Sequence, residues 1–383
     1  MSVKICIIPP AGEILGPEKA VEFMEEFSCK TRILSGPGTI RALSSFGGTR
    51  LFLVSDPYFV KNGTARKVVE ASGCQASEIF DDVRPDPTVE LAAEGTARVR
   101  AFGPELMVAL GGGSAMDCAK AMAYFSKCNC PLVAIPTTSG SGSEVTDFAI
   151  LSHDRVKHPL VDPRLRPAGA ILDSDLLQEL PKPLIAETGF DVLTHAAEAY
   201  VAQNAGSISD LYARESFSSA YAALPASYAG QKSLRLKVHM AATMAGMAFT
   251  QAGLGLCHAM AHSLGGFFHI SHGRLNAILL PSVIGCNAHV AGKKYAELAR
   301  AAGIGGSADT IAVRNLKNGL IRLRRELDLP ETLAQAGIDP GQIWRYAPDI
   351  VAATLADPCC AANPMKVEDF LVRRILEEVT GRV

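Results

Sequence analysis

Four of the chain's nine histidines lie in one short segment, GLGLCHAMAHSLGGFFHISHG, at residues 253–273. His258 and His262 are four residues apart, so a helix would place them on one face. His272 follows the glycine pair at 265–266, where we expect that helix to end. Imidazoles that gather among apolar residues need partners for their ring nitrogens, and a divalent cation is a frequent partner. The segment therefore predicts part of a metal site.

A second segment, GFDVLTHAAEAY at residues 189–200, has the same spacing. Asp191 and His195 are four residues apart in a pattern that suits a helix, so one helical face would present a carboxylate and an imidazole. Together with His258 and His272 they could complete a ligand set. Pairs at this spacing are also common as surface ion pairs or helix ends. The spacing alone leaves open whether the two segments meet in space.

The composition is that of an ordinary globular protein. The chain has 383 residues, of which 48% are hydrophobic and 20% charged, with a net charge of -2. This length favours two domains, and the near-neutral charge argues against nucleic acid or an anionic membrane as a partner. We find neither an apolar run of about 18 residues nor a secretory signal, which predicts a cytoplasmic protein. The ten cysteines include a C-x-C at 128–130 and a pair at 359–360, spacings that favour reduced thiols.

Residues 28–186 alternate short apolar runs with helical patterns. We expect strands at 50–56, 106–110 and 132–135 and a helix at 115–125. Such alternation predicts a mostly parallel sheet with helices on both faces. In sheets of this kind ligands bind beyond the carboxyl ends of the strands.

Polar and glycine-rich residues follow these predicted strands. GGGS at 111–114 joins a strand to a helix, an arrangement that suits a pyrophosphate but also any tight turn. PTTSGSGSE at 136–144 could hold a nucleotide or be a flexible loop. Asp56 could accept hydrogen bonds from a ribose diol, which favours NAD over NADP, or could cap a helix. The three segments together predict a dinucleotide site.

Residues 187–383 are rich in Ala, Leu, Met and Glu at helical spacing, and we interpret them as an all-α domain. Both histidine segments lie in it, so the active site would lie in the cleft between the two domains. Residues 1–27 are expected to be an extension, with a short strand at 3–8 and an amphipathic helix from Pro17 that packs on the protein itself, on a twin subunit or on a partner.

Five motifs resemble the iron-dependent, or group III, alcohol dehydrogenases. They are GGGSAMDCAKA (111–121), AIPTTSGSGSEVT (134–146), TGFDVLTHAAEAY (188–200), the histidine segment at 253–273 and NAILLPSVI (276–284). The similarity covers residues 30–383. Within the family the chain most resembles the propanol dehydrogenases of bacterial microcompartments, with lactaldehyde/1,2-propanediol oxidoreductases close behind.

The resemblance implies an α/β dinucleotide-binding domain at 28–186, with a mostly parallel sheet, and an all-α metal-binding domain at 187–383. It implies Fe²⁺ as the metal, although the ligand types also suit Zn²⁺. The implied metal ligands are Asp191, His195, His258 and His272, and His262 becomes a non-ligand and a candidate proton relay. The implied NAD contacts are Asp56, Asp86, Gly112, Gly113, Ser114, Thr137, Thr138, Thr146 and Lys157. Asp86 departs from the family, which usually has Asn there.

The expected activity is NAD-dependent, reversible reduction of short-chain aldehydes such as propanal and acetaldehyde to primary alcohols, which regenerates NAD. We expect a homodimer or larger homo-oligomer, in the cytoplasm or inside a bacterial microcompartment, with a shell protein or an aldehyde dehydrogenase as partner. Alternatives are a lactaldehyde/1,2-propanediol oxidoreductase, a metal-dependent lyase that resembles dehydroquinate synthase, and a non-catalytic nucleotide-binding shell component. The apolar Phe267 and Phe268 disfavour the lyase. A metalloprotease is disfavoured because HAMAH lacks the glutamate of H-E-x-x-H.

Overall fold

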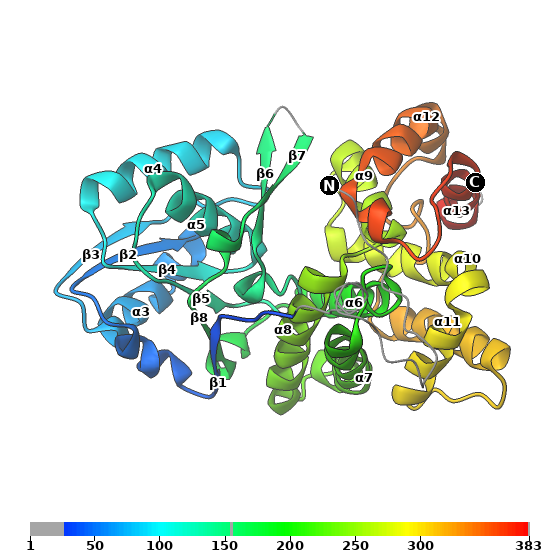
Figure 1. Cartoon of the computed structure of the whole chain (residues 1–383), viewed down its shortest axis with the longest axis horizontal. Coiled ribbons are helices and arrows are strands. Elements are labelled where there is room, and N and C mark those ends of the chain that lie inside the picture. Colours follow the sequence, from blue (N-terminus) through cyan, green and yellow to red (C-terminus); the bar gives the residue numbers. More distant parts are fainter. Residues whose placement is uncertain (1–26, 154–155, 382–383) are drawn as a thin grey trace, which may run out of the picture.

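The computed structural model describes residues 27–153 and 156–381. Its two parts lie side by side in Figure 1, with the sheet on the left and a wholly helical part on the right. The strand expected at 3–8 and nearly all of the helix expected from Pro17 lie outside the described residues.

Six parallel strands form the main sheet, which confirms the predicted α/β class. Their order is β1 (Arg32–Gly36), β8 (Gly169–Asp173), β5 (Leu132–Pro136), β4 (Leu106–Gly111), β2 (Arg50–Ser55) and β3 (Ala76–Phe80). The antiparallel pair β6 (Phe148–His153) and β7 (Val156–Val161) makes a second, small sheet. The carboxyl ends of the parallel strands therefore share one edge, where β2, β4 and β5 lead into the segments singled out from the sequence.

Side chains of β2 show why both faces of the sheet are covered. Phe52 and Val54 belong to one hydrophobic cluster, and Leu51 and Leu53 belong to another, because successive side chains of a strand point to opposite faces. Neighbouring strands contribute to both clusters, and the helices that pack on the sheet through them are η2 (Thr39–Phe46), α3 (Thr64–Ser72), α4 (Val89–Phe102) and α5 (Gly113–Ser126). The short α2 (Pro57–Lys61) follows β2. Short 3₁₀ turns complete this part: η3 (Ser143–Val145), η4 (Pro163–Leu165) and η5 (Ser174–Leu177).

The described remainder of the chain is helical, as predicted. The elements are α6 (Lys182–Val201), α7 (Ser207–Tyr228), η6 (Lys232–Leu234), α8 (Arg235–Ala252), α9 (Leu256–Phe268), α10 (His272–Ala301), α11 (Asp309–Glu326), α12 (Pro340–Ala356), η7 (Pro358–Ala362) and α13 (Asp369–Thr380). α6 is buried without a break from Gly189 to Val201 and packs against α7, α8 and α10. It begins at Lys182, before the domain boundary that we placed at 186–187.

One helix among the described residues, α10, is long and apolar enough to cross a membrane by length and composition alone, with a mean hydropathy of 1.3 in its most apolar window. Within that window, 67% of the residues are buried inside the protein. This is the pattern of a core helix.

The two parts touch closely at a pair of glycines. A Cβ on Gly142, which precedes η3, would lie 2.8 Å from the Cα of Gly246 in α8, and a Cβ on Gly246 would lie 2.6 Å from the carbonyl oxygen of Gly142. Beside them the buried Glu144 carboxylate accepts a 2.5 Å hydrogen bond from the Thr243 hydroxyl. This contact fixes the loop after β5 against the helical part.

Candidate metal centre and nucleotide cleft

The four predicted metal ligands come together, although they belong to three helices. Asp191 and His195 lie on α6, His258 lies on α9 and His272 is the first residue of α10. The Asp191 carboxylate lies 3.9 Å from Nδ1 of His195, 3.7 Å from Nε2 of His258 and 3.6 Å from Nε2 of His272. The rings of His195 and His258 stack with centroids 4.5 Å apart. The spacing argument therefore found residues that are neighbours in space.

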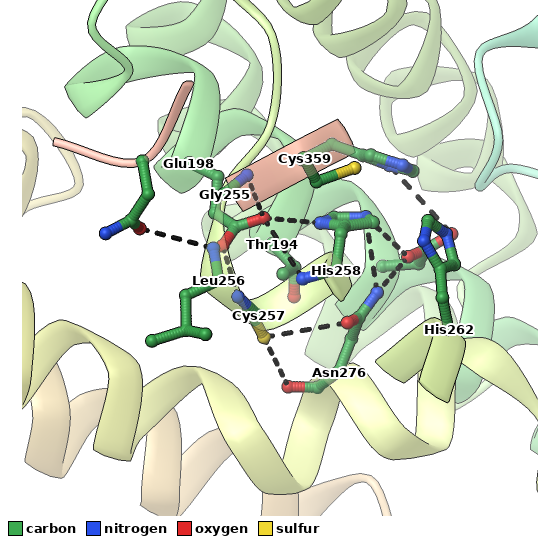
Figure 2. A network of polar contacts seen from close by, with 12 residues as sticks. Thr194, Glu198, Gly255, Leu256, Cys257, His258, His262, Asn276 and Cys359 are labelled. Carbon is green, nitrogen blue, oxygen red and sulfur yellow. Dashed lines mark hydrogen bonds and ion pairs between the residues drawn. The ribbon is translucent and has the colours of Figure 1, made fainter. Parts of the chain in front are cut away.

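Glu198 positions His258. The N-cap of α9 is Gly255, so no side chain of that helix caps its first turn. The Glu198 carboxylate of α6 acts as the cap instead. It accepts hydrogen bonds from the N–H groups of Gly255 (3.1 Å) and Cys257 (2.6 Å). The same carboxylate accepts a 2.5 Å hydrogen bond from Nδ1 of His258, which leaves Nε2 to face Asp191. Figure 2 shows this network around the start of α9. A buried carboxylate that orients a histidine through its second nitrogen is typical of metal sites.

The chemistry of the cluster fits a divalent cation. Nδ1 of His195 is buried without a hydrogen-bond partner, which is costly unless something else engages it. The nitrogens lie 3.6–3.9 Å from the Asp191 carboxylate oxygens, which is too far for a hydrogen bond. Two ligand atoms that bind one tetrahedral metal at about 2.1 Å lie about 3.4 Å apart, close to these separations. The cluster thus has the donor types of a coordination shell. Ligand atoms of Asp191, His195 and His258 all lie within 4.8 Å of one another, and His272 joins them through its contact with Asp191.

The protonation states point the same way. Burial lowers the pKa of His195 to about 4 and that of His272 well below its usual value, so both imidazoles stay neutral. Burial opposes the charged form of Asp191, but the surrounding histidines outweigh it and hold the pKa of this carboxyl below its usual range. Burial also disfavours charge on His258, yet Asp191 and Glu198 raise its pKa to about 9. Without an ion, the positive charge beside Asp191 is therefore the His258 proton, which a bound cation would have to displace.

His262 lies beside the cluster and is held by a residue that the sequence did not single out. Its Nδ1 donates a 2.9 Å hydrogen bond to Oδ2 of Asp357, 95 residues away, at the start of η7. Its ring stacks on that of His272 with centroids 5.1 Å apart. Burial opposes the charge of Asp357, but His262 outweighs that effect and the pKa of the carboxyl is lowered.

The helix that carries His262 runs further than expected. We predicted that it would end at the glycine pair 265–266, but α9 continues to Phe268. The residue that ends it is His269, in the left-handed region at φ 55°. The His269 side chain is exposed.

A cleft of about 950 Å³ opens at the carboxyl edge of the main sheet. Its lining includes Asp56, Gly112, Thr137 and Thr138, four of the nine residues predicted to contact NAD. Other lining residues were not foreseen, among them Gly38, Ile40, Arg41, Lys67, Asp173, Leu180 and Leu184. Leu184 lies in the first turn of α6, and Asp191 follows seven residues later, or about 10 Å along the helix axis. One helix therefore leads from the cleft to the metal cluster.

The start of α5 suits a pyrophosphate. Gly112 is its N-cap, no side chain caps its first turn, and the helix begins at Gly113. A Cβ on Gly112 would lie 3.2 Å from Oγ1 of Thr138, so the two segments that line the cleft meet at this glycine. Unpaired N–H groups at a helix N-terminus attract an anion. The fit does not require the G-x-G-x-x-G pattern.

Asp56 caps a helix and also lines the cleft, the two positions that the sequence left open for it. Its Oδ1 accepts a 2.9 Å hydrogen bond from the N–H of Tyr58, which makes it the N-cap of α2. The residue is half-buried and also lines the cleft, and a Cβ on Gly111 would lie 3.6 Å from its Oδ2. The cap orients the carboxylate toward the glycine turn.

Five other residues predicted for NAD do not line this cleft in the described part of the chain. Gly113 and Ser114 adjoin it at the start of α5. Thr146 is fully buried, and its hydroxyl accepts a 2.9 Å hydrogen bond from Lys120. This bond holds the loop after β5 against α5. Asp86 and Lys157 form an ion pair with each other at 2.7 Å, between the segment before α4 and β7.

Phe249 of α8 supplies an apolar wall at the metal cluster. Its ring stacks on His195 with centroids 4.6 Å apart and lies 5.7 Å from that of Phe148 at the start of β6. Phe267 and Phe268, the aromatics cited from the sequence, pack instead against Tyr346 of α12. The aromatic surface beside the cluster is therefore contributed by residues from both parts of the fold.

The remaining histidines lie elsewhere. His158 and His289 are exposed, and His153 contacts Glu90 at 3.0 Å. His239 is buried between the parts, where its Nδ1 and the Ser139 hydroxyl are 3.0 Å apart.

A parallel sheet with a nucleotide-sized cleft, next to a helical part with a carboxylate and three imidazoles, is the arrangement of a metal-dependent, nucleotide-linked oxidoreductase. Comparison with known proteins agrees. Residues 30–174 match the sequence model described as iron-containing alcohol dehydrogenase, and residues 185–380 match that of the C-terminal part of the Fe-containing alcohol dehydrogenase family. The chain belongs to the iron-containing alcohol dehydrogenase family, and it is an oxidoreductase.

Several relatives are similar over nearly their whole length. The 1-propanol dehydrogenase PduQ of Citrobacter freundii is 38% identical, with 93% of this chain and 100% of that protein covered. The NADPH-dependent butanol dehydrogenase of Clostridium saccharobutylicum is 33% identical, with 92% and 97% covered.

Solved structures share the fold. An iron-containing alcohol dehydrogenase from Thermococcus thioreducens superposes with a TM-score of 0.86 at 32% identity, covering 92% of this chain and 99% of that one. Sulfoacetaldehyde reductase from Bifidobacterium kashiwanohense, solved in complex with NAD⁺, superposes with a TM-score of 0.84 at 25% identity, covering 93% and 98%.

Proposed function

We propose that this protein interconverts short-chain aldehydes, such as propanal and acetaldehyde, and primary alcohols with NAD(H) as the hydride carrier. The observation that carries the proposal is the cluster of Asp191 with three histidines, midway along the helix whose first turn lines the cleft. The 38% identity to a 1-propanol dehydrogenase supports this substrate class.

Asp191, His195, His258 and His272 are the proposed metal ligands, with Fe²⁺ as the family's ion and Zn²⁺ as an ion that the same donors suit. A bound divalent cation supplies Lewis acidity to the substrate oxygen. Glu198 holds His258 in the tautomer that presents Nε2. The neutral His195 and His272 keep their lone pairs available for coordination.

The cleft is the proposed NAD site. Asp56 is placed to accept hydrogen bonds from a ribose diol, and the start of α5 at Gly112 is placed to receive the pyrophosphate. Thr137 and Thr138 line the same cleft. For Gly113 and Ser114 we propose backbone contacts in the first turn of α5. Asp86 and Lys157, which form an ion pair with each other, stay proposed cofactor contacts outside the cleft.

His262 is the proposed proton relay. Because Nδ1 donates to Asp357, Nε2 is the nitrogen that can exchange a proton. The apolar wall of Phe249 and Phe148 favours a small, uncharged substrate and excludes bulk water.

We further propose aldehyde reduction as the physiological direction, which regenerates NAD. The setting would be the cytoplasm or the interior of a bacterial microcompartment, since the motifs resemble the propanol dehydrogenases of those bodies. A homodimer or larger homo-oligomer, with a shell protein or an aldehyde dehydrogenase as partner, belongs to the same proposal.

The test is NADH oxidation by anaerobically prepared, iron-loaded protein with propanal, acetaldehyde, butanal and lactaldehyde. We expect metal-dependent turnover with the unsubstituted short aldehydes. Equal metal-free turnover would refute the proposed role of the cluster, and a strong preference for lactaldehyde would shift the proposal to a lactaldehyde/1,2-propanediol oxidoreductase. Failure to oxidise NADH with any aldehyde would reject the proposed reaction.

A further inference from the structure

A second group of donor atoms lies next to the metal cluster and uses different residues. Asp357 accepts hydrogen bonds from Nδ1 of His262 (2.9 Å) and from the N–H of Cys359 (2.8 Å). One ligand atom from each of His262, Asp357 and Cys359 lies within 4.8 Å of the other two. The three side chains are only partly buried, so an ion could reach them from solvent. Figure 2 shows Cys359 and His262 in the polar network around His258.

The arrangement selects one of two adjacent thiols. Asp357 is the N-cap of η7, and its bond to the Cys359 N–H fixes the first turn of that element. Cys360, the next residue, directs its thiol to the carbonyl oxygen of Thr354 at 3.0 Å. Cys359 therefore belongs to the donor group and Cys360 does not.

An imidazole, a carboxylate and a thiolate are the ligands of a borderline-soft divalent ion, which can take three protein groups and leave one position for water. The two anionic donors balance a dipositive ion when His262 is neutral. Coordination would replace the thiol proton of Cys359, which leaves to solvent. By contrast, the Asp191 cluster offers only nitrogen and oxygen.

We propose that His262, Asp357 and Cys359 form a second cation site, which takes Zn²⁺ or Cd²⁺ and is separate from the Asp191 cluster. An ion bound at Nδ1 of His262 takes the place of its proton, which moves to Nε2, and so ends the hydrogen bond to Asp357. Occupancy therefore inhibits turnover reversibly, a consequence that rests on the relay role proposed for His262, whereas the binding itself does not.

Cadmium titration of the iron-loaded protein under anaerobic conditions tests the site, because cadmium–thiolate bonds absorb in the ultraviolet and no proposed ligand of the iron cluster contains sulfur. We expect wild type and the matched control Cys360→Ser to gain thiolate absorption with one bound ion, and Cys359→Ser to lack that increment. Other thiols, such as the pair at 128–130, contribute equally to all three proteins and cancel in the difference.

His262→Gln provides a second variant that keeps the thiol, and it should also bind at least about tenfold more weakly. An unchanged cadmium titration in Cys359→Ser or in His262→Gln would overturn the site. Inhibition of NADH oxidation by Cd²⁺ that is reversed by a chelator in wild type and absent in Cys359→Ser is the expected activity result. Since absorption reports binding without turnover, a protein that lacks aldehyde reductase activity but binds cadmium at Cys359 would refute the proposed function and leave this site standing.

Discussion

The side-chain amide of Asn276 donates a hydrogen bond to Oδ1 of Asp191 across 2.7 Å. Its nitrogen also lies 3.1 Å from Nε2 of His272, one turn earlier on α10, and 3.4 Å from Nε2 of His258. Asn276 is fully buried. One amide thus contacts three of the four proposed ligands and fixes the carboxylate between them.

We predict that Asn276→Ala weakens metal binding by about 10–100-fold, because the Asp191 carboxylate loses the partner that orients it. Chelator competition and metal analysis per subunit measure this change. NADH binding, which we propose for the cleft at the start of α6, should stay unchanged. His289→Ala, an exposed position on the same helix, is the matched control. Wild-type metal affinity in Asn276→Ala would show that Asn276 does not support the ligands.

Glu198→Gln should destabilise the metal-free protein by about 2–3 kcal/mol. The substituted amide would turn an N–H₂ group toward at least one of the N–H donors of Gly255 and Cys257, which a carboxylate satisfies together. Urea unfolding measures the loss. Glu179→Gln, at an exposed carboxylate just before α6, should change stability by less than about 0.5 kcal/mol. Equal effects of the two substitutions would contradict the capping role of Glu198.

How much of this site was accessible from the sequence depends on the distance between its parts along the chain. The four-residue spacings of Asp191–His195 and His258–His262 are local and were predictable, and Asn276 follows His272 at the same spacing, so that signal was available but unused. Asp357 reaches His262 across 95 residues and has no local signature.

A motif reports neither backbone conformation nor burial, which limited what the sequence could predict at two places. α9 passes through its glycine pair and ends at His269, and a non-glycine residue in the left-handed region is uncommon enough to escape prediction. Thr146 lies in a nucleotide-like motif, but its hydroxyl is occupied by the buried Lys120.

Asp56→Asn should improve the use of NADPH relative to NADH. The substitution keeps the N-cap of α2 but removes a negative charge that would face a 2′-phosphate, a change of roughly 1–2 kcal/mol or about five- to thirtyfold in relative kcat/KM. Arg41 and Lys67 line the same cleft and can then attract the phosphate. Steady-state kinetics with both cofactors measure the ratio, and Asp82→Asn, outside the cleft, is the control. An unchanged ratio of kcat/KM for NADPH and NADH would show that Asp56 does not determine which cofactor is used.

His262→Gln should lower kcat by about 100-fold or more if His262 relays the proton, and Asp357→Asn should lower it less, since the relay remains but loses the partner that orients it. The KM for NADH should stay constant in both. The pH profile of kcat distinguishes a proton relay from a residue that only packs in the site, because its shape should change in His262→Gln if His262 relays the proton. His269→Gln, exposed at the end of the same helix, should behave as wild type. A wild-type pH profile in His262→Gln would assign the relay elsewhere.

His239 makes stability depend on pH. Burial lowers its pKa to about 4, so between the unfolded value of about 6.5 and 4 the unfolded chain binds a proton that the native protein does not. Stability should therefore fall on acidification through this window, by roughly 2 kcal/mol between about pH 7 and about pH 5 from this residue alone. The variant His239→Asn, which keeps a polar group near Ser139, should show a shallower fall in urea unfolding.

The comparison of the two proteins isolates this histidine, because groups such as Asp117, whose pKa burial raises to about 6, titrate in both and cancel. Ser139→Ala removes the hydrogen bond to Nδ1 but keeps the imidazole buried, so its pH dependence should remain that of wild type. Identical slopes in wild type and His239→Asn would mean that the native protein admits a proton at His239. The contact between the loop after β5 and α8 would then be more open to water than its burial implies.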